Sequence, residues 1–168
     1  MSALDPTTWL PNRELFLARL QRTVAAAGRV RAHLALLYID LDRFQDFNDL
    51  FGREAGDRVL HEAAVRILRA CPRGTRLGRV GGDDFAAVVK GGDAGRIAKL
   101  ARTVLEDCGA PYVVHCVSVP VTASIGIALY PLHGKDGAEL MRSAERALYR
   151  AKLNGRNCFY PFQAASAA

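Results

Sequence analysis

The stretch of sequence that decides the fold reads Arg79-Val80-Gly81-Gly82-Asp83-Asp84-Phe85. Apolar residues flank the glycine pair, so the sequence predicts a short strand over residues 77–80 that turns back into a second strand over residues 85–89. We expect the two glycines to make the tight turn, because glycine adopts the positive φ angles that such turns need. Asp83 and Asp84 would then lie at the tip of a β-hairpin.

Two neighbouring carboxylates at a hairpin tip have two interpretations. Gly-Gly-Asp is ordinary turn chemistry, and a tip has no core to bury its acids, so the pair could be a solvated turn. Alternatively, the pair belongs to a metal site, because close carboxylates repel each other unless a cation neutralises them.

A second acidic pair favours the metal site. Asp40 and Asp42 directly follow the apolar run of residues 34–39, which predicts a strand buried on both faces at the centre of a sheet. The two-residue period of a strand would point both carboxylates to one side, at the strand end where ligands of α/β sheets gather.

Composition limits the class of protein. The chain has 168 residues, half of them hydrophobic and 24% charged, which predicts one globular domain. We expect a cytoplasmic protein with no membrane insertion, because no apolar run approaches the roughly 20 residues of a membrane span and the N-terminus lacks the charged and apolar regions of a signal peptide. The cysteines form no C-x-x-C pair and the histidines have no metal-ligand spacing, so structural thiols are expected.

The formal net charge of +6 suits an anionic partner such as a nucleotide. Nucleic acid is not expected, because the chain has no aromatic-basic ladder, zinc-finger spacing or recognition-helix motif.

Apolar periodicity places the remaining elements. Helices are predicted over residues 13–27, 57–70, 94–106 and 137–153, with Asn12 as the cap of the first. The apolar stripe of the first helix would consist of Leu17, Leu20, Val24 and Ala27. Two further strands are expected over residues 112–119 and 121–129. This order predicts an α+β fold, with a mixed central β-sheet flanked by helices, over residues 1–162. Residues 163–168 have the composition of a frayed tail or the start of a linker.

Polar residues near helix ends have structural explanations as well as functional ones. Asp57 would be the N-cap of its helix, a position at which aspartate is common. Lys152 and Arg156 would lie where the last helix stops, at an end where cations complement the helix dipole. Both could equally bind phosphate.

Several ordered motifs together resemble the GGDEF domain, the catalytic domain of bacterial diguanylate cyclases, whose fold is related to that of nucleotidyl cyclases. The matching segments are residues 5–13, 40–49, 52–57, 81–85, 122–128 and 147–157. The resemblance implies that two GTP molecules are condensed into cyclic di-GMP and two pyrophosphates for second-messenger signalling. One GTP would be held by each half of an antiparallel homodimer.

The resemblance also implies roles for the acidic residues. Asp40, the backbone carbonyl of Leu41 and Asp83 would ligate Mg²⁺ or Mn²⁺, hard ions that prefer oxygen ligands. Asp83 would in addition help to deprotonate the ribose 3′-hydroxyl that attacks the α-phosphorus of the partner's GTP. Asp84 stands at the fourth signature position and would act as a metal ligand or support one.

Nucleotide recognition is implied at two further places. Asn48 and Asp57 match the guanine-reading positions, where a carboxylate can accept from the N1 and N2 donors that adenine lacks. Lys152 and Arg156 match the phosphate-binding positions.

The chain departs from the family pattern at several positions. Asp84 replaces the usual Glu and is shorter by one methylene, about 1.5 Å of reach. Gln45 replaces a Lys, Trp9 a Gly and Arg53 a His. The R-x-x-D product-inhibition motif is missing, since its positions hold Pro72, Arg73, Gly74 and Thr75.

Two functions from different classes follow. The domain is a diguanylate cyclase, with activity that the shortened carboxylate could reduce. Alternatively, it is a catalytically degenerate GTP-binding domain that regulates an attached output domain, such as a cyclic di-GMP phosphodiesterase. Both imply GTP as ligand and covalently linked sensor or output domains.

Overall fold

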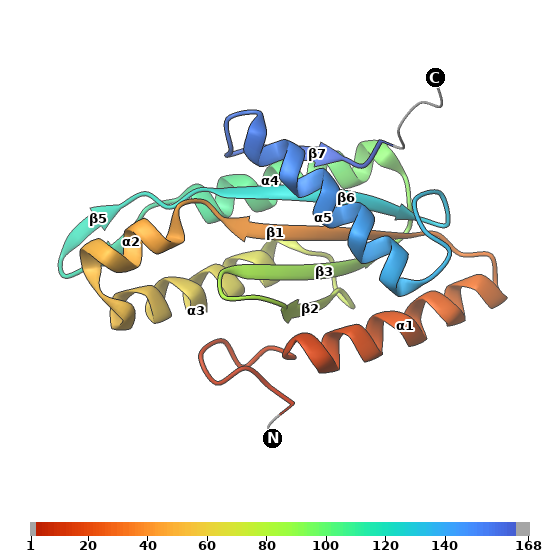
Figure 1. Cartoon of the computed structure of the whole chain (residues 1–168), viewed down its shortest axis with the longest axis horizontal. Coiled ribbons are helices and arrows are strands. Elements are labelled where there is room, and N and C mark those ends of the chain that lie inside the picture. The colour runs from red at the N-terminus through yellow and green to blue at the C-terminus, as the bar shows by residue number, and fades with distance from the viewer. Residues whose placement is uncertain (1–2, 164–168) are drawn as a thin grey trace.

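The computed structural model describes residues 3–163, and its centre is a five-stranded sheet in the order β2-β3-β1-β6-β7 (Figure 1). The helices are α1 (Arg13–Arg29), α2 (Phe44–Phe51), α3 (Arg53–Ala70), α4 (Ala94–Gly109) and α5 (Gly137–Leu153). The strands are β1 (Leu34–Leu41), β2 (Arg76–Arg79), β3 (Asp84–Lys90), β4 (Tyr112–Val114), β5 (Val117–Val119), β6 (Ala123–Tyr130) and β7 (Phe159–Pro161).

Strand β1 is the middle of the sheet, as its uninterrupted apolar run predicts. All of its residues are buried, and it pairs antiparallel with β3 on one side and with β6 on the other. Strand β7 runs parallel to β6. The sheet is therefore mixed and flanked by helices, which confirms the predicted α+β class.

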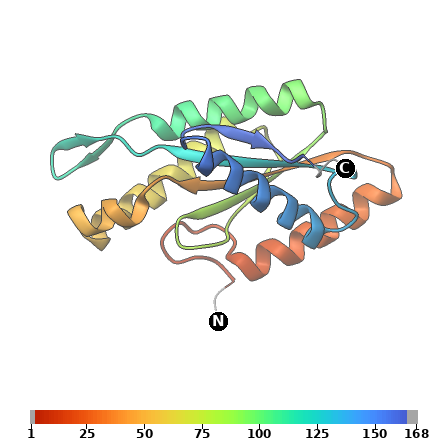
Figure 2. The ribbon, with the colours of Figure 1, turned by 45° about the horizontal axis from the view of Figure 1, so that its top comes forward.

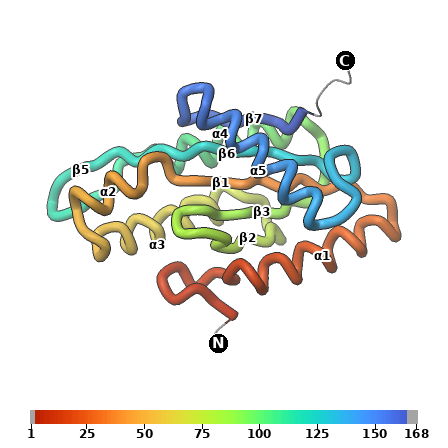
Figure 3. Tube along the Cα trace, viewed as in Figure 1, coloured from red at the N-terminus to blue at the C-terminus, as the bar shows by residue number. Residues whose placement is uncertain are grey.

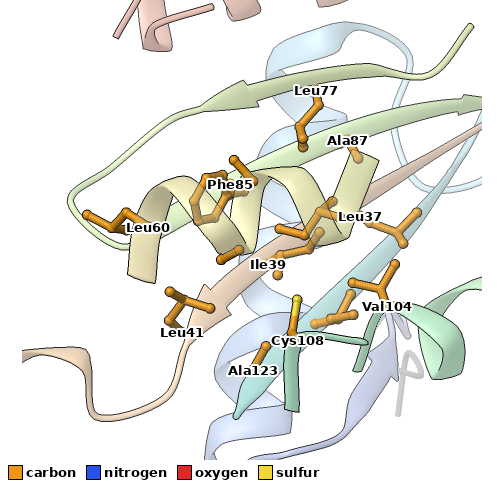
Figure 4. Packing of buried hydrophobic residues seen from close by; sticks show 14 of the residues in the cluster. Leu37, Ile39, Leu41, Leu60, Leu77, Phe85, Ala87, Val104, Cys108 and Ala123 are labelled. Atoms are coloured by element: carbon orange, nitrogen blue, oxygen red, sulfur yellow. The ribbon is translucent and has the colours of Figure 1, made fainter. Parts of the chain in front are cut away.

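Two apolar cores form because neighbouring residues of β1 point to opposite faces of the sheet. Leu37, Ile39 and Leu41 pack with residues of α3 and α4 on one face (Figure 4). Leu36 and Tyr38 pack with α1 and α5 on the other face. The turned view shows the two helical layers on either side of the strands (Figure 2). Even-numbered residues at the end of β1 therefore point toward the α5 side.

The predicted helix starts agree with the structure at α1 and α5. The Asn12 side chain accepts a hydrogen bond from the backbone N–H of Leu15, which confirms the cap, and α5 spans the predicted residues. In α1, Phe16 is buried where we expected Leu17, which packs only partly against the core.

The region between β1 and α3 differs from the prediction. Residues 44–51 form α2, and α3 begins at Arg53 rather than at residue 57. Asp57 therefore lies inside α3 and is not its N-cap. Gly56, which precedes the predicted helix, is buried within α3, and a Cβ there would lie 1.8 Å from Asn48 Oδ1. Its role is to let α2 and α3 approach each other closely.

Residues 112–119 also differ from the single strand that we expected. They form the β4–β5 hairpin, a separate two-stranded sheet whose turn residues His115 and Cys116 adopt positive φ angles (Figure 3). All the cysteines are free thiols, as expected. Of the predicted tail, residues 164–168 lie outside the described residues. Within residues 3–163, no helix is long and apolar enough to cross a membrane.

Candidate active site at the signature hairpin

The turn between β2 and β3 forms as predicted, but not for the predicted reason. The backbone N–H groups of Val80 and Gly81 both donate to the carbonyl of Asp84, at 2.8 and 3.3 Å. Neither Gly81 nor Gly82 has a positive φ angle. Glycine is required at position 81 because a Cβ would lie 2.4 Å from Oδ2 of Asp84. The missing side chain makes room for a carboxylate.

The hairpin brings three carboxylates together. Side-chain oxygens of Asp40, Asp83 and Asp84 all lie within 4.8 Å of one another. Asp84 is opposite Asp40 in the β1–β3 register, and the N–H of Leu41 donates to the carbonyl of Asp83 at 3.2 Å. Asp40 is buried and the other two are half-buried, so our expectation of an uncovered hairpin tip was wrong. Strand β1 covers the tip.

The electrostatics of this carboxylate cluster favour a bound cation. Burial, a hydrogen bond with Asp40 and repulsion from the two other acids raise the pKa of Asp84 to about 7. Burial and repulsion from Asp40 also raise the pKa of Asp83. Lys152 opposes both shifts and Arg79 opposes that of Asp83, yet both pKa values stay raised. The cluster consists of oxygen ligands that need more positive charge, which fits a divalent ion.

The two cations that we expected to bind phosphate have different surroundings. The Nζ of Lys152 donates to Oδ2 of Asp40 at 2.6 Å, so the end of α5 is joined to the cluster. Arg156 follows the helix with a φ of 63°, is exposed, and forms no ion pair among the described residues.

Asp42 points to the same face as Asp40 but has another environment. Its carboxylate accepts from the hydroxyls of Thr122 and Ser124, both at 2.6 Å, and from the N–H of Asn157 at 3.0 Å. It therefore joins the end of β1 to β6 and to the turn after α5. Residues 122–128 match a family motif, but the sequence analysis did not predict that they bind Asp42. Two hydroxyl residues spaced two apart on a strand point to the same side, and this spacing could have indicated the contact.

The predicted guanine-reading residues are brought near each other by the α2–α3 contact. Oδ1 of Asn48 is buried over Gly56 and has no hydrogen-bond partner. Asp57, the next residue, is exposed and lines a groove of about 610 Å³ together with Pro6, Thr7 and others. The unpartnered acceptor on α2 and the open carboxylate on α3 are each able to receive an N–H donor.

Sequence reasoning missed the residues that hold the N-terminal loop to the hairpin. Arg79 forms a largely buried ion pair with Asp5 at 3.0 Å, and its Nε donates to the carbonyl of Gly82 at 3.1 Å. Arg13 donates to the carbonyl of Val80 at 3.0 Å. The Arg79–Asp5 and Arg13–Val80 contacts join residues 74 and 67 positions apart, so no local sequence pattern predicts them.

Comparisons with known proteins agree with this geometry. The family model described as diguanylate cyclase, GGDEF domain, matches residues 2–158. The bifunctional diguanylate cyclase/cyclic di-GMP phosphodiesterase MucR of Pseudomonas aeruginosa is 39% identical over 158 residues, which are 93% of this chain and 23% of MucR. Diguanylate cyclase TpbB of the same species is 40% identical over 157 residues, 90% of this chain and 35% of TpbB.

Solved structures are equally similar. The GGDEF domain of TpbB superposes with a TM-score of 0.91 at 35% identity, covering 95% of this chain and 94% of that domain. The GGDEF domain of DgcB from Caulobacter crescentus, in complex with c-di-GMP, gives 0.90 at 27% identity and covers 98% of both chains. The chain spans about a quarter to a third of the length of MucR and TpbB. It belongs to the GGDEF family of diguanylate cyclase domains.

Proposed function

We propose that this domain is a diguanylate cyclase that condenses two GTP molecules into cyclic di-GMP with release of two pyrophosphates. The observation that carries the proposal is the carboxylate cluster of Asp40, Asp83 and Asp84 at the signature hairpin, with Lys152 beside it. Family membership and the cyclic di-GMP bound by the similar domain of DgcB support the choice of nucleotide.

The donor set fits a magnesium or manganese ion. The ligands would be Asp40, the carbonyl of Leu41 and Asp83, which are all oxygens, with Asp84 as a further ligand or support. The raised pKa values of Asp83 and Asp84 indicate a site that lacks positive charge. When bound, the ion would stabilise the negative charge that develops on the α-phosphate.

The chain's own groups would then position and activate the nucleophile. The 3′-oxygen of one GTP forms a bond to the α-phosphorus of the other, the bond from that phosphorus to pyrophosphate breaks, and the hydroxyl proton passes to Asp83. Asp83 is half-buried at the hairpin tip, so a substrate carried by a second chain can reach it. Two such steps close the ring, and each half of a homodimer would bring one GTP.

Asn48 and Asp57 would select guanine over adenine. The buried, unpartnered Oδ1 of Asn48 and the open carboxylate of Asp57 are acceptors, and guanine offers donors at N1 and N2. The ammonium of Lys152 lies at the cluster, where it can also contact a triphosphate, and exposed Arg156 would bind the terminal phosphates.

A second candidate function rests on Asp84. The family is named for a signature with Glu at this position, and Asp is shorter by about 1.5 Å. A misplaced ligand could leave a domain that binds GTP without turnover and regulates an attached domain, as in a longer protein of the MucR kind. Residues 1–162 would be one domain of such a protein.

Cyclic di-GMP formation by the native chain tests the proposal. The chain is incubated with GTP and Mg²⁺ or Mn²⁺ at concentrations that favour dimers, and cyclic di-GMP and pyrophosphate are quantified by chromatography. We expect one cyclic di-GMP for every two pyrophosphates. In Asp83→Ala the rate of cyclic di-GMP formation should fall by at least about a thousandfold. GTP binding without any product, in a protein whose dimer is verified, would favour the regulatory function instead.

A further inference from the structure

Asp42 contacts the turn between α5 and β7 as well as the sheet. This turn, residues 154–158, is called the α5–β7 turn and is the blue loop that joins the two elements in Figure 1. Oδ1 of Asp42 accepts a hydrogen bond from the hydroxyl of Ser124 at 2.6 Å. Oδ2 accepts from the hydroxyl of Thr122 at 2.6 Å and from the backbone N–H of Asn157 at 3.0 Å. Oδ1 therefore bonds to β6, whereas Oδ2 also bonds to the α5–β7 turn.

The backbone of the α5–β7 turn adopts an uncommon conformation. The φ angles of Gly155, Arg156 and Asn157 are 100°, 63° and 48°, all in the left-handed region. Glycine adopts this region freely, and asparagine more readily than most residues, but a Cβ makes it unfavourable for arginine. Two neighbouring residues with side chains keep such angles when surrounding contacts fix them. The contacts of the turn therefore determine its shape.

Hydrogen bonds from three directions fix the turn. The carbonyl of Ala151 in α5 accepts from the N–H of Arg156 at 3.1 Å, and β6 donates a backbone N–H to the carbonyl of Cys158 at 2.9 Å. Between these two contacts, the N–H of Asn157 donates to Asp42. The contact with Asp42 joins the turn to the strand end that carries the carboxylate cluster.

The side chain of Arg156 depends on this backbone for its placement. Arg156 is exposed, and its guanidinium forms no hydrogen bond or ion pair within residues 3–163. Lys152 differs, because its Nζ donates to Oδ2 of Asp40 at 2.6 Å. The position of the Arg156 guanidinium is therefore set by the turn from which the side chain extends, whereas Lys152 has a side-chain contact of its own.

We propose that Asp42 is a positioning residue that places Arg156 to bind the terminal phosphates of GTP. The inference rests on the proposed function, because phosphate binding by Arg156 is part of it. Asp42 acts through the N–H of Asn157 and contacts neither nucleotide nor metal. It therefore increases the preference for a triphosphate over a monophosphate without affecting the recognition of guanine.

The affinities for a triphosphate and for GMP test the inference, because both contain guanine and only the triphosphate has β- and γ-phosphates. The triphosphate is a GTP analogue whose α–β bridging oxygen is replaced by methylene, so that pyrophosphate cannot leave. Calorimetry with Mg²⁺ measures both affinities, and their ratio is the quantity compared. In Asp42→Ala we expect this ratio to fall about tenfold, while the affinity for GMP stays within about twofold of the native value.

Two matched variants separate positioning from stability. Ser124→Ala removes the donor to Oδ1 and leaves both contacts of Oδ2, so it should destabilise the fold and keep the native ratio. Asp42→Asn keeps an oxygen that accepts from Thr122 and Asn157, and its amide can donate to Ser124, so this variant should also keep the native ratio.

A double variant shows whether Asp42 acts through Arg156. Arg156→Ala alone should lower the ratio about tenfold, because it removes the guanidinium. Adding Asp42→Ala to Arg156→Ala should lower the ratio no further, since a positioning residue has no effect once the group that it positions is absent. Two losses that multiply mean that Asp42 affects phosphate binding independently of Arg156, and this result overturns the inference.

Loss of the Asp42 carboxylate also destabilises the fold, so circular dichroism must show a folded Asp42→Ala at the temperature of the titration. If this variant does not fold, a second one removes the turn contact alone. Nonsense suppression introduces the α-hydroxy analogue of Asn157, in which an ester oxygen takes the place of the N–H that donates to Asp42. The ratio should again fall about tenfold.

The outcomes distinguish the inference from the proposed function. An unchanged ratio in folded Asp42→Ala or in the ester, together with a lowered ratio in Arg156→Ala, overturns the positioning role alone. Equal losses of affinity for both nucleotides also overturn it, because Asp42 then supports the whole site. If Arg156→Ala leaves the ratio unchanged, or the native chain does not bind the GTP analogue, the phosphate site of the proposed function fails and the inference fails with it.

Discussion

Asp40 and Asp42 lie two residues apart at the end of β1, are exposed by only 6% and 8%, and point to the same face. Asp42 accepts three hydrogen bonds from uncharged donors, so both of its carboxylate oxygens have hydrogen-bond partners. Asp40 lies in the carboxylate cluster with Asp83 and Asp84, and its ion pair is with Lys152. The difference separates a carboxylate that stabilises the fold from a carboxylate cluster whose members repel one another, which is the kind of strained site that we propose for binding and chemistry.

The largest expected effect on stability follows from removing the satisfied carboxylate. Asp42→Ala would leave the Thr122 and Ser124 hydroxyls and the Asn157 N–H without an acceptor, so we expect it to lower the free energy of unfolding by about 2–4 kcal/mol. Asp40→Asn is the matched variant and should change stability by less than about 1 kcal/mol, since it removes repulsion as well as the Lys152 ion pair. Urea unfolding of both compares them. Equal losses would contradict the distinction between the two sites.

A smaller effect is expected at the guanine-reading position. Because Asp57 lies inside α3 and not at its N-cap, Asp57→Ala should leave the urea midpoint nearly unchanged. It should weaken GTP binding about tenfold to a hundredfold, as for loss of a charged hydrogen-bond acceptor, without affecting the weak binding of ATP. Calorimetry with both nucleotides measures this. A lower melting temperature with unchanged GTP affinity would mean that Asp57 is structural.

The smallest effect concerns pH. The pKa of Asp84 is about 7 in the folded chain and about 3.8 as a free side chain, so the folded state holds a proton that the unfolded state releases. Its stabilising contribution is complete below pH 3.8 and is lost as the pH rises through about 7. With metal removed by a chelator, we expect the native chain to gain stability from pH 8 to pH 5.5, and Asp84→Asn to lose most of that gain. If the urea midpoints of the two proteins change with pH by the same amount, Asp84 does not hold the extra proton and the carboxylates of the cluster do not repel one another.

Much of the fold could be predicted from local pattern. The apolar run of β1, the hairpin around Gly81 and the Asn12 cap of α1 are signals that a few residues carry alone. Helix α2 was missed because Gly52 and Gly56 indicate a loop, while the reason for Gly56 is contact with Asn48, a residue of another helix. Propensity cannot reveal a glycine that is selected by tertiary packing.

In the candidate site, too, the sequence predicted some features and missed others. The motifs gave the residues that the structure gathers in the carboxylate cluster, but not the 2.6 Å contact between Lys152 and Asp40 or the partners of Asp42. Those contacts join residues about 80 to 115 positions apart, and they form only once the helix and strand ends have come together. The roles of the site residues in binding and turnover stay predictions.

The central claim is that the carboxylate cluster performs cyclic di-GMP synthesis, and Asp84→Glu tests it most directly. The measurement is the rate of cyclic di-GMP formation by the native chain, Asp84→Glu and Asp83→Ala, with Mn²⁺, at dimer-favouring concentration. We predict that Asp84→Glu is at least about tenfold faster than the native chain with nearly the same affinity for GTP, because the longer side chain restores geometry in the transition state. If Asp84→Glu is as inactive as Asp83→Ala while it still binds GTP and dimerises, the cluster is not a catalytic site limited by the shortened carboxylate, and the claim is contradicted.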